Sequence, residues 1–192
     1  MNWKSVIEKY KSYLKIERGL SDNSVINYLY DINAILKYYK INTEKSNPID
    51  ISSEQLQNFI YEEAKSKSSY SLARRISGLK SFFNYLNFEK IREDDPSSKI
   101  ESPKIGRKLP EVLTIKEIER IIKTIDMSHS QGQRNMAIIE TLYGSGLRVS
   151  ELINLTISNL FFKEKIIKVI GKGNKQRLIP MGDYSKKHLI NY

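Results

Sequence analysis

The sequence lacks cysteine entirely and holds only two histidines, His129 and His188, among its 192 residues. Without cysteine the chain can form no disulfide, no thiolate metal site and no cysteine nucleophile. With two histidines, a histidine-rich metal site is not expected either. A chain without cysteine suits a cytoplasmic protein, and we expect that location.

Long apolar runs are lacking as well. No run approaches the roughly 18 residues that a membrane span requires. The first 20 residues are amphipathic and do not have the pattern of a signal peptide. A composition of 40% hydrophobic and 28% charged residues is typical of a globular chain. We therefore expect a folded protein with no membrane segment.

Acidic residues are outnumbered by basic ones. The 32 lysines and arginines exceed the 22 acidic residues, and the net charge of +10 favours a polyanionic partner such as nucleic acid or an anionic membrane surface. The lack of a membrane segment favours nucleic acid. Much of the excess lies between residues 163 and 187, which hold eight cations and two acidic side chains. The alternative is an ordinary solvated lysine surface.

The first half of the chain has the apolar periodicity of four helices. Two stripes at helical spacing lie within residues 3–14 and 25–39, and Ser52 with Gln55 forms a capping box that starts a third helix. A fourth helix carries a narrow apolar seam: Leu72, Ile76, Leu79, Phe83 and Leu86. These patterns predict a helical first domain over residues 1–88.

The opposite face of the fourth helix carries small residues around an arginine. Its members are Ser71, Arg74, Ser77, Gly78 and Ser81. Small residues let a backbone come close, as a phosphate contact requires, but they also suit packing against another helix, and the two interpretations are equally supported. The neighbouring Arg75 tilts the balance slightly, so we predict that Arg74 and Arg75 contact DNA.

A linker and a second domain follow. Residues 89–110 hold three of the five prolines and no helical period, which predicts a linker before a domain at residues 111–192. Thr114 and Glu117 form a capping box for a helix whose apolar residues are expected to be buried. Those residues are Ile118, Ile121, Ile122 and Ile125.

The rest of the second domain mixes helices with a hairpin. A helix from about 133 to 143 should stop at Gly144 or Gly146, and a short helix should follow Arg148. Two β-rich runs, 166–170 and 176–180, flank the glycine-rich turn 171–175, which predicts a β-hairpin. A last helix begins at Asp183. The fold class is therefore mainly α with a small β-hairpin.

Arg148 is unusual because a cation at a helix N-terminus opposes the helix dipole and costs about 0.3–1 kcal/mol. Backbone N–H groups there already favour an anion, and a guanidinium adds a fork that matches phosphate. Glu151 lies one turn on and can pair with Arg148 to fix its direction. The alternative is a purely structural salt bridge between the two.

Nucleotide-binding fingerprints do not fit the two glycine-rich segments. GSGLRV lacks the third glycine of the dinucleotide motif and follows a helix, and GKGNKQR lacks the spacing of a P-loop. Paired carboxylates, a serine with a histidine partner and metal-ligand spacings do not stand out either. We therefore expect no cofactor and no metal ion.

Several segments resemble the tyrosine recombinase (phage integrase) family, and within it the bacterial Xer recombinases. GSGLRVSELINL and IIKVIGKGNKQRLIP are similar to the family's arginine box and β-hairpin. SLARRISGLKSFFNYL resembles the helix before its linker, and KLPEVLTIKEIERII resembles the start of its catalytic domain. The resemblance implies a SAM-like, four-helix core-binding domain followed by the first half of an α+β catalytic domain.

The resemblance also implies a reaction: site-specific breakage and rejoining of DNA through a 3′-phosphotyrosine intermediate, without metal or ATP. Arg148 matches the first catalytic arginine, which stabilises charge on the scissile phosphate, and Lys172 matches the lysine that protonates the leaving 5′ oxygen. Glu151 matches an acidic position that supports them. Lys175 and Arg177 of the hairpin are expected to contact DNA. In the family two domains clamp the duplex, and four protomers act on two DNA sites.

The sequence departs from the family pattern after the hairpin. The family also needs a His-x-x-Arg box, a further histidine or tryptophan, and a tyrosine nucleophile. His188 is followed three residues later by Asn191 instead of arginine, and Tyr192 follows the hairpin too closely. We therefore expect the N-terminal portion of a recombinase that holds no nucleophile, does not cleave DNA and exposes apolar surface.

Three alternatives stay open. The chain could be a non-catalytic DNA-binding protein derived from a truncated recombinase gene, or it could serve mobile-element integration instead of chromosome dimer resolution. The short linker and the lack of an additional N-terminal domain favour the Xer-like setting. A basic interaction module unrelated to DNA is the third, and it would bind its partner with little salt dependence.

Overall fold

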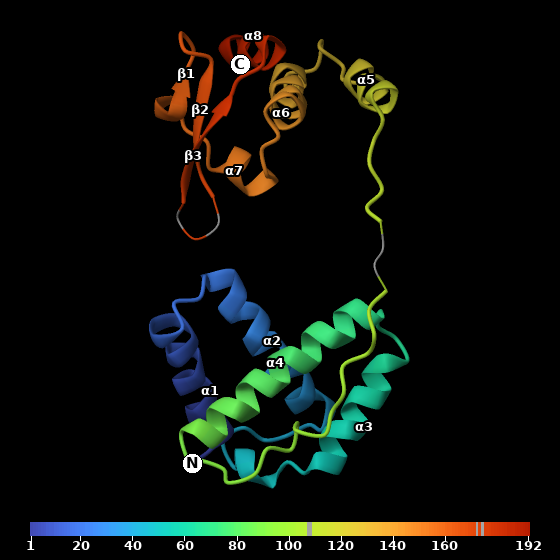
Figure 1. The fold of residues 1–192 in the computed structure, drawn as a ribbon, viewed down its shortest axis with the longest axis vertical. Helices are drawn as coiled ribbons and strands as arrows, with labels where there is room; N and C mark the ends of the chain where they lie inside the picture. Colours follow the sequence, from blue (N-terminus) through green and yellow to red (C-terminus); the bar gives the residue numbers. More distant parts are fainter. Residues whose placement is uncertain (107–108, 172, 174) are drawn as a thin grey trace. The chain divides into compact units, whose positions relative to one another are not determined.

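The computed structural model describes residues 1–106, 109–171, 173 and 175–192, and it divides into two compact units, Met1–Lys108 and Leu109–Tyr192. Figure 1 shows the first unit as helices and the second as helices with a small sheet. Lys172, one of the predicted site residues, lies outside the described residues.

The first unit contains the four predicted helices. They are α1 (Trp3–Ser12), α2 (Asp22–Tyr38), α3 (Ser53–Ala64) and α4 (Ser69–Phe88). A π-helical turn, Tyr13–Glu17, extends α1, and a 3-10 turn, Pro48–Asp50, precedes α3. In Figure 1, α4 crosses the unit and packs against α2 and α3.

The core of the first unit is built around α4. All five seam residues predicted for this helix are buried, so that prediction is confirmed. Aromatic rings from α1 pack on α4: Trp3 stacks on Phe82 with ring centroids 5.7 Å apart, and Tyr10 meets Phe82 edge-on at 5.1 Å. Each fully buried large apolar side chain contributes about 1.5–3 kcal/mol, so this cluster dominates the stability of the unit.

The predicted capping box of α3 is present. The Ser52 hydroxyl accepts from the Gln55 backbone N–H at 3.1 Å, and the Gln55 side chain accepts from the Ser52 N–H at 2.9 Å. Ile51 and Leu56 beside it are buried. Two helix N–H groups that would otherwise lack partners are satisfied, which fixes where α3 starts.

The predicted linker, 89–110, divides into two parts. Residues 89–100 pack against the first unit: Ile100 and Arg92 are buried, and the Arg92 guanidinium donates to the Pro48 carbonyl at 2.8 Å. Residues 101–106 have no regular secondary structure. The first unit thus uses more chain than four helices, while the predicted functional domain boundaries stay a prediction.

The second unit contains helices and a three-stranded antiparallel sheet of order β1-β2-β3. The helices are α5 (Ile115–Lys123), α6 (Gly132–Ser145), α7 (Val149–Ile153) and α8 (Asp183–Asn191). The strands are β1 (Leu160–Phe161), β2 (Ile166–Ile170) and β3 (Gln176–Pro180), with Ile167 opposite Ile179. The two hairpin strands match the prediction, whereas β1 is only two residues long and was missed.

The core of the second unit is small. Its buried apolar residues are Leu147, Ile167, Val169 and Met181. Helices α6 and α8 pack closely, because Gly144 has no side chain: a Cβ there would lie 2.7 Å from the Ser185 hydroxyl, which donates to the Glu140 carbonyl at 2.7 Å. Within the described ranges, no helix is both long enough and apolar enough to cross a membrane.

The prediction that the apolar residues of α5 are buried is wrong. Its capping box forms as predicted, with the Glu117 carboxylate accepting from the Thr114 N–H at 2.7 Å, but Ile121 keeps 40% of its surface exposed. The helix meets the rest of the unit along one edge, where Ile118 and Ile122 help to line a cavity of about 310 Å³. An amphipathic pattern therefore predicted the helix correctly but not what covers its apolar face.

Candidate phosphate-binding site

Arg148 is placed by the chain reversal between α6 and α7. Gly146 ends α6 in the left-handed conformation, with φ of 60°, as predicted for a C-terminal glycine. Leu147 is buried and anchors the turn, and Arg148 then takes extended backbone as the residue before α7. The Arg148 side chain is 63% exposed, so its guanidinium faces solvent from the start of the helix.

Glu151 holds two arginines together. Its carboxylate accepts from the Arg148 backbone N–H at 2.8 Å, from Arg148 Nη1 at 3.0 Å and from Arg177 Nη2 at 2.8 Å. The residue itself is buried. The hydrogen bond from the Arg148 backbone N–H, together with the two guanidiniums, lowers the pKa of the Glu151 carboxyl, so the carboxylate is ionised at neutral pH.

The turn end of the hairpin lies against this cluster. A Cβ on Gly171 would lie 3.2 Å from Glu151 Oε1 and 3.9 Å from Arg148 Nη1. The Gly171 N–H donates to the Lys175 carbonyl at 2.8 Å and closes the turn. Glycine therefore permits close contact between the hairpin and the ion pair. Lys172 follows Gly171 in sequence, and its catalytic role stays a prediction.

The charges at this cluster do not cancel. One buried carboxylate faces two guanidiniums, and both arginine side chains keep substantial exposure, 63% for Arg148 and 42% for Arg177. The excess positive charge therefore faces solvent at a helix start, which is a suitable arrangement for an oxyanion. The predicted salt bridge between Arg148 and Glu151 exists, and it orients the guanidinium without enclosing it.

The contact between Arg177 and Glu151 was not predicted from the sequence. Arg177 was predicted only as a DNA contact, yet it reaches Glu151 across 26 positions of sequence. The hairpin register places Arg177 opposite Val169, but it does not show that α7 packs against this strand, so no signal in the sequence indicated the pairing. Lys175 is exposed at the turn, and its contact with DNA stays a prediction.

Arg74 and Arg75 lie in the first unit and share a buried partner, Asp31 of α2. Arg74 makes a bidentate contact with Asp31, with Nη1 donating to Oδ2 at 2.9 Å and Nη2 to Oδ1. The Arg75 side chain is almost fully buried and pairs with Glu63 at 2.6 Å. Because only 5% of the Arg75 side chain is exposed, it offers little surface to DNA, and its contact with DNA stays a prediction.

The face of α4 that carries small residues is partly packed against other helices and partly exposed. Gly78 packs on Asp31, where a Cβ would lie 2.0 Å from the carboxylate, and the Tyr10 hydroxyl donates to Ser81 at 2.9 Å. Those two residues serve helix packing, whereas Ser71 and Ser77 remain exposed. Asp31 was not singled out in the sequence, although an acid on the apolar face of α2 requires a buried partner.

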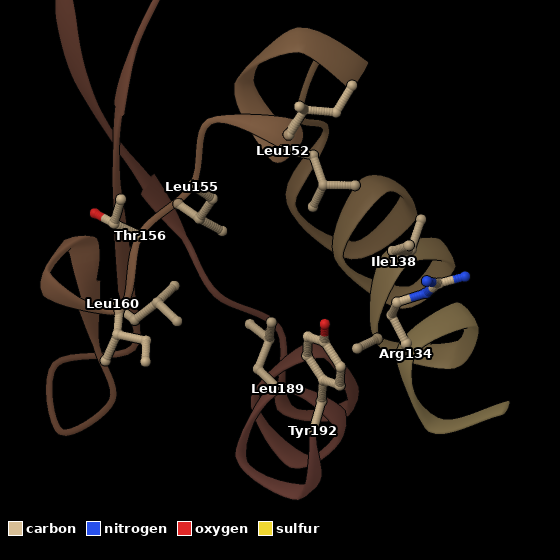
Figure 2. A pocket seen from close by; sticks show the side chains of 11 residues that line it. Arg134, Ile138, Leu152, Leu155, Thr156, Leu160, Leu189 and Tyr192 are labelled. Atoms are coloured by element: carbon tan, nitrogen blue, oxygen red, sulfur yellow. The ribbon is translucent and has the colours of Figure 1, made fainter. Parts of the chain in front are cut away.

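An apolar cavity of about 420 Å³ lies between α6, α7 and α8, and its lining does not include Arg148, Glu151 or Arg177. Figure 2 shows Tyr192 and Leu189 of the last segment facing Ile138 and Leu152 across it. Tyr192 thus lines an apolar space, while Gln133 donates to the His188 carbonyl at 3.0 Å. In the described part of the chain, no group of three or more His, Asp or Glu side chains could hold a metal ion.

Two family models match the chain. The model described as "Phage integrase family" matches residues 111–192, and that described as "Phage integrase, N-terminal SAM-like domain" matches residues 7–90. Together they span most of the sequence. The chain therefore belongs to the phage integrase, or tyrosine recombinase, family, and the predicted fold class is confirmed: a SAM-like helical domain precedes part of a catalytic domain.

Among individual proteins, the chain is related to tyrosine recombinases named XerD. It is 40% identical to that of Oceanobacillus iheyensis over 187 residues, covering 97% of this chain and 63% of the relative. It is 35% identical to that of Yersinia pestis over 188 residues, covering 97% and 62%. The chain thus spans less than two thirds of the length of these relatives.

A solved structure supports the same fold. A lambda integrase fragment, in a crystal structure described as a dimer bound to a COC′ core site, matches with a TM-score of 0.75. The two are 20% identical, and the match covers 100% of this chain and 69% of the other. At that identity the likeness concerns the fold alone.

Proposed function

We propose that this chain binds duplex DNA and holds a backbone phosphate at Arg148 for site-specific strand cutting and rejoining. The observation that carries the proposal is the Arg148 guanidinium, fixed by the buried Glu151 and exposed on its other side. A fixed cation aimed at a transition-state anion is typically worth about 10²–10³ in rate. Glu151 is the positioning residue, since it sets the direction of Arg148 and Arg177.

Lys172 and the other hairpin cations complete the proposed site. Lys172 would donate a proton to the leaving 5′ oxygen, a contribution of about 10²–10⁴ in rate. Lys175 and Arg177 would contact the DNA backbone near the scissile phosphate, and Arg74 would contact it from the first unit. The proposed reaction passes through a 3′-phosphotyrosine and is carried out by four protomers on two DNA sites, as in chromosome dimer resolution or, alternatively, mobile-element integration.

A second candidate function is DNA binding without cleavage. The observation that favours it is the position of Tyr192, which lines the apolar cavity of Figure 2 with Leu152 and Leu189 and not the Arg148 cluster. We assign the attacking tyrosine to no residue of this chain. The two candidates share the DNA surface and differ in whether a tyrosine that is not among these 192 residues completes the reaction.

The role of Arg148 can be tested through the salt dependence of DNA binding. For each phosphate that is neutralised, the slope of log affinity against log salt changes by about one. We expect Arg148→Ala to reduce that slope by about one, while Arg120→Ala, at an exposed arginine of α5, leaves it unchanged. An unchanged slope for Arg148→Ala would contradict the assignment of a phosphate to Arg148.

Cleavage itself can be tested with a nicked suicide duplex, which traps a covalent intermediate. We expect the chain to retain the labelled duplex on a native gel and to release all of it on a denaturing gel. A protein–DNA adduct that survives denaturation would show that a tyrosine of this chain attacks the DNA. The prediction that the chain holds no nucleophile would then be wrong.

A further inference from the structure

Arg177 lies on the inner face of the β2–β3 hairpin, the face that packs on the core of the second unit. Ile167 and Val169 of β2 are buried on this face, and Ile179 of β3, opposite Ile167, packs with them. Residues directly opposite in an antiparallel pair share a face, and side chains alternate along each strand. Because Arg177 stands opposite Val169, its side chain belongs to the same inner face.

The partner of Arg177 on this face is Glu151 of α7. Arg177 Nη2 donates to Glu151 Oε2 at 2.8 Å, and the Glu151 side chain is buried. Figure 1 shows α7 beside the hairpin. Arg177 lies two residues closer to the turn than Ile179, so the ion pair continues the contact between hairpin and core where the apolar contacts end.

Both strands of the hairpin meet the same carboxylate. Arg177 contacts Oε2 of Glu151 from β3, and Gly171, the residue after β2, approaches Oε1, where a Cβ would lie 3.2 Å away. Gly171 also closes the turn, because its N–H donates to the Lys175 carbonyl at 2.8 Å. These contacts hold the turn end of the hairpin on α7.

Glu151 links the hairpin to Arg148 as well. Its Oε1 accepts from Arg148 Nη1 at 3.0 Å, and its Oε2 accepts from the Arg148 backbone N–H at 2.8 Å. One carboxylate with one guanidinium would be neutral, so Arg177 supplies the positive charge that is in excess. The position of the hairpin and the charge that a phosphate meets at Arg148 thus depend on one ion-pair cluster.

Lys168 offers the comparison of a hairpin cation outside this cluster. It stands opposite Leu178, one residue away from Val169 in β2, and therefore belongs to the outer face. Removal of Lys168 takes one positive charge from the same hairpin without touching Glu151. A cation that serves only as a charge for DNA has no need of a buried partner, whereas Arg177 has one.

We propose that Arg177 is a positioning residue: through Glu151 it fixes the turn end of the β2–β3 hairpin on α7 before DNA arrives, so that the hairpin and Arg148 meet one phosphate together. The proposal rests on the proposed function and deepens it, because it gives Arg177 a task in the free protein besides a DNA contact. The segment between Gly171 and Lys175 includes Lys172, the predicted proton donor, which lies outside the described residues.

The first test uses the free chain without DNA. Amide hydrogen exchange, followed by NMR, reports how often the Gly171 N–H leaves the Lys175 carbonyl. We expect Arg177→Ala to speed this exchange about tenfold, because a charge-assisted hydrogen bond is lost. Arg177→Lys should restore most of the protection, since an ammonium still pairs with Glu151, and Lys168→Ala should leave the exchange unchanged.

Exchange at Ala137 separates positioning from general stability. Ala137 is buried within α6, so its amide becomes accessible when the second unit unfolds. Faster exchange at Gly171 with unchanged exchange at Ala137 supports the role of Arg177. Equal acceleration at both amides, or unchanged exchange at Gly171, would overturn it.

The second test measures duplex affinity at constant salt for Arg148→Ala, Arg177→Ala and the double variant. Two independent phosphate contacts would lower affinity by factors that multiply, whereas residues joined through one carboxylate are coupled. We expect each single variant to weaken binding about tenfold, and the double variant to add less than about threefold to the larger single loss. Losses that multiply would overturn the proposal that Arg177 and Arg148 meet one phosphate together.

Failure of the positioning role and failure of the proposed function give different results. If the parent chain binds no duplex, the proposed function fails, while exchange at Gly171 still decides whether Arg177 holds the hairpin. If the parent binds duplex with a steep salt slope but exchange at Gly171 ignores Arg177→Ala, DNA binding stands and the positioning role is wrong.

Discussion

At the scale of single residues, two buried carboxylates organise the arginines of this chain. Glu151 receives Arg148 and Arg177 in the second unit, and Asp31 receives Arg74 in the first. In both places a buried acid orients a cation that remains partly exposed. Such an arrangement restrains the guanidinium before a ligand arrives, so less side-chain freedom is lost on binding.

Glu151 should make stability depend on pH. Its pKa is lowered in the folded state, so its contribution is present above the ordinary value of 4.5 and is lost as pH falls through the lowered pKa. We expect Glu151→Gln to lower the melting temperature of the second unit at neutral pH, and the difference from the parent to shrink in acid. Calorimetry across that pH range measures it.

The matched control is Glu164→Gln, at an exposed glutamate between β1 and β2. Its effect should stay within about 0.5 kcal/mol, as for ordinary surface substitutions. A Glu151→Gln deficit that persists unchanged at low pH would mean that the carboxylate's charge is not what stabilises the site.

Gly78 should tolerate no side chain. A Cβ there would lie 2.0 Å from Asp31 Oδ2, so Gly78→Ala should destabilise the first unit by about 1–3 kcal/mol through overpacking. The single tryptophan, Trp3, is buried in this unit, and its fluorescence during urea unfolding reports the change.

Gly106 provides the comparison, because a Cβ there meets nothing within 4 Å. In Gly106→Ala the urea midpoint reported by Trp3 fluorescence should be the same as in the parent. Equal midpoints for the two glycine variants would show that α2 and α4 can separate without cost.

At the scale of elements, side-chain caps set where several helices begin. Ser52 with Gln55 and Thr114 with Glu117 each satisfy two backbone donors reciprocally. These boundaries were predictable because a capping box depends on residues three apart in sequence. Both hairpin strands were predictable for the same reason, since alternation and the glycine-rich turn are local.

Removal of the α3 cap tests this local account. Ser52→Ala should cost about 1 kcal/mol, because the Gln55 N–H loses its side-chain acceptor. Ser53→Ala, at the next residue and exposed, changes the same atoms outside the cap and should be nearly neutral. The urea midpoint of Trp3 fluorescence separates the two, and an indistinguishable pair would refute the assigned role of the cap.

Features that depend on distant partners were not predictable. The pairing of Asp31 with Arg74 joins α2 to α4, and the contact of Arg177 with Glu151 joins β3 to α7. The exposure of Ile121 likewise depends on what packs against α5, which no pattern within that helix encodes. Local periodicity identified the elements and the candidate cations, and tertiary contacts determined which cations stay available.

At the scale of the whole molecule, a net charge of +10 is combined with a family fold and two restrained arginine sites. Each unit contributes one of these sites, and each unit has its own core. A chain of this kind should bind a polyanion mainly through phosphate contacts. Binding of that type releases counterions and therefore weakens steeply with salt.

The central claim is that this chain binds duplex DNA through phosphate contacts. Its most direct test is the affinity of the chain for a labelled duplex, measured by fluorescence anisotropy at a series of salt concentrations. If about four phosphates are contacted, log affinity should fall linearly with log salt, and affinity should drop roughly a hundredfold between about 50 and about 200 mM. An affinity that stays flat across that range would contradict the account, because it would mean that the exposed arginines hold no phosphates.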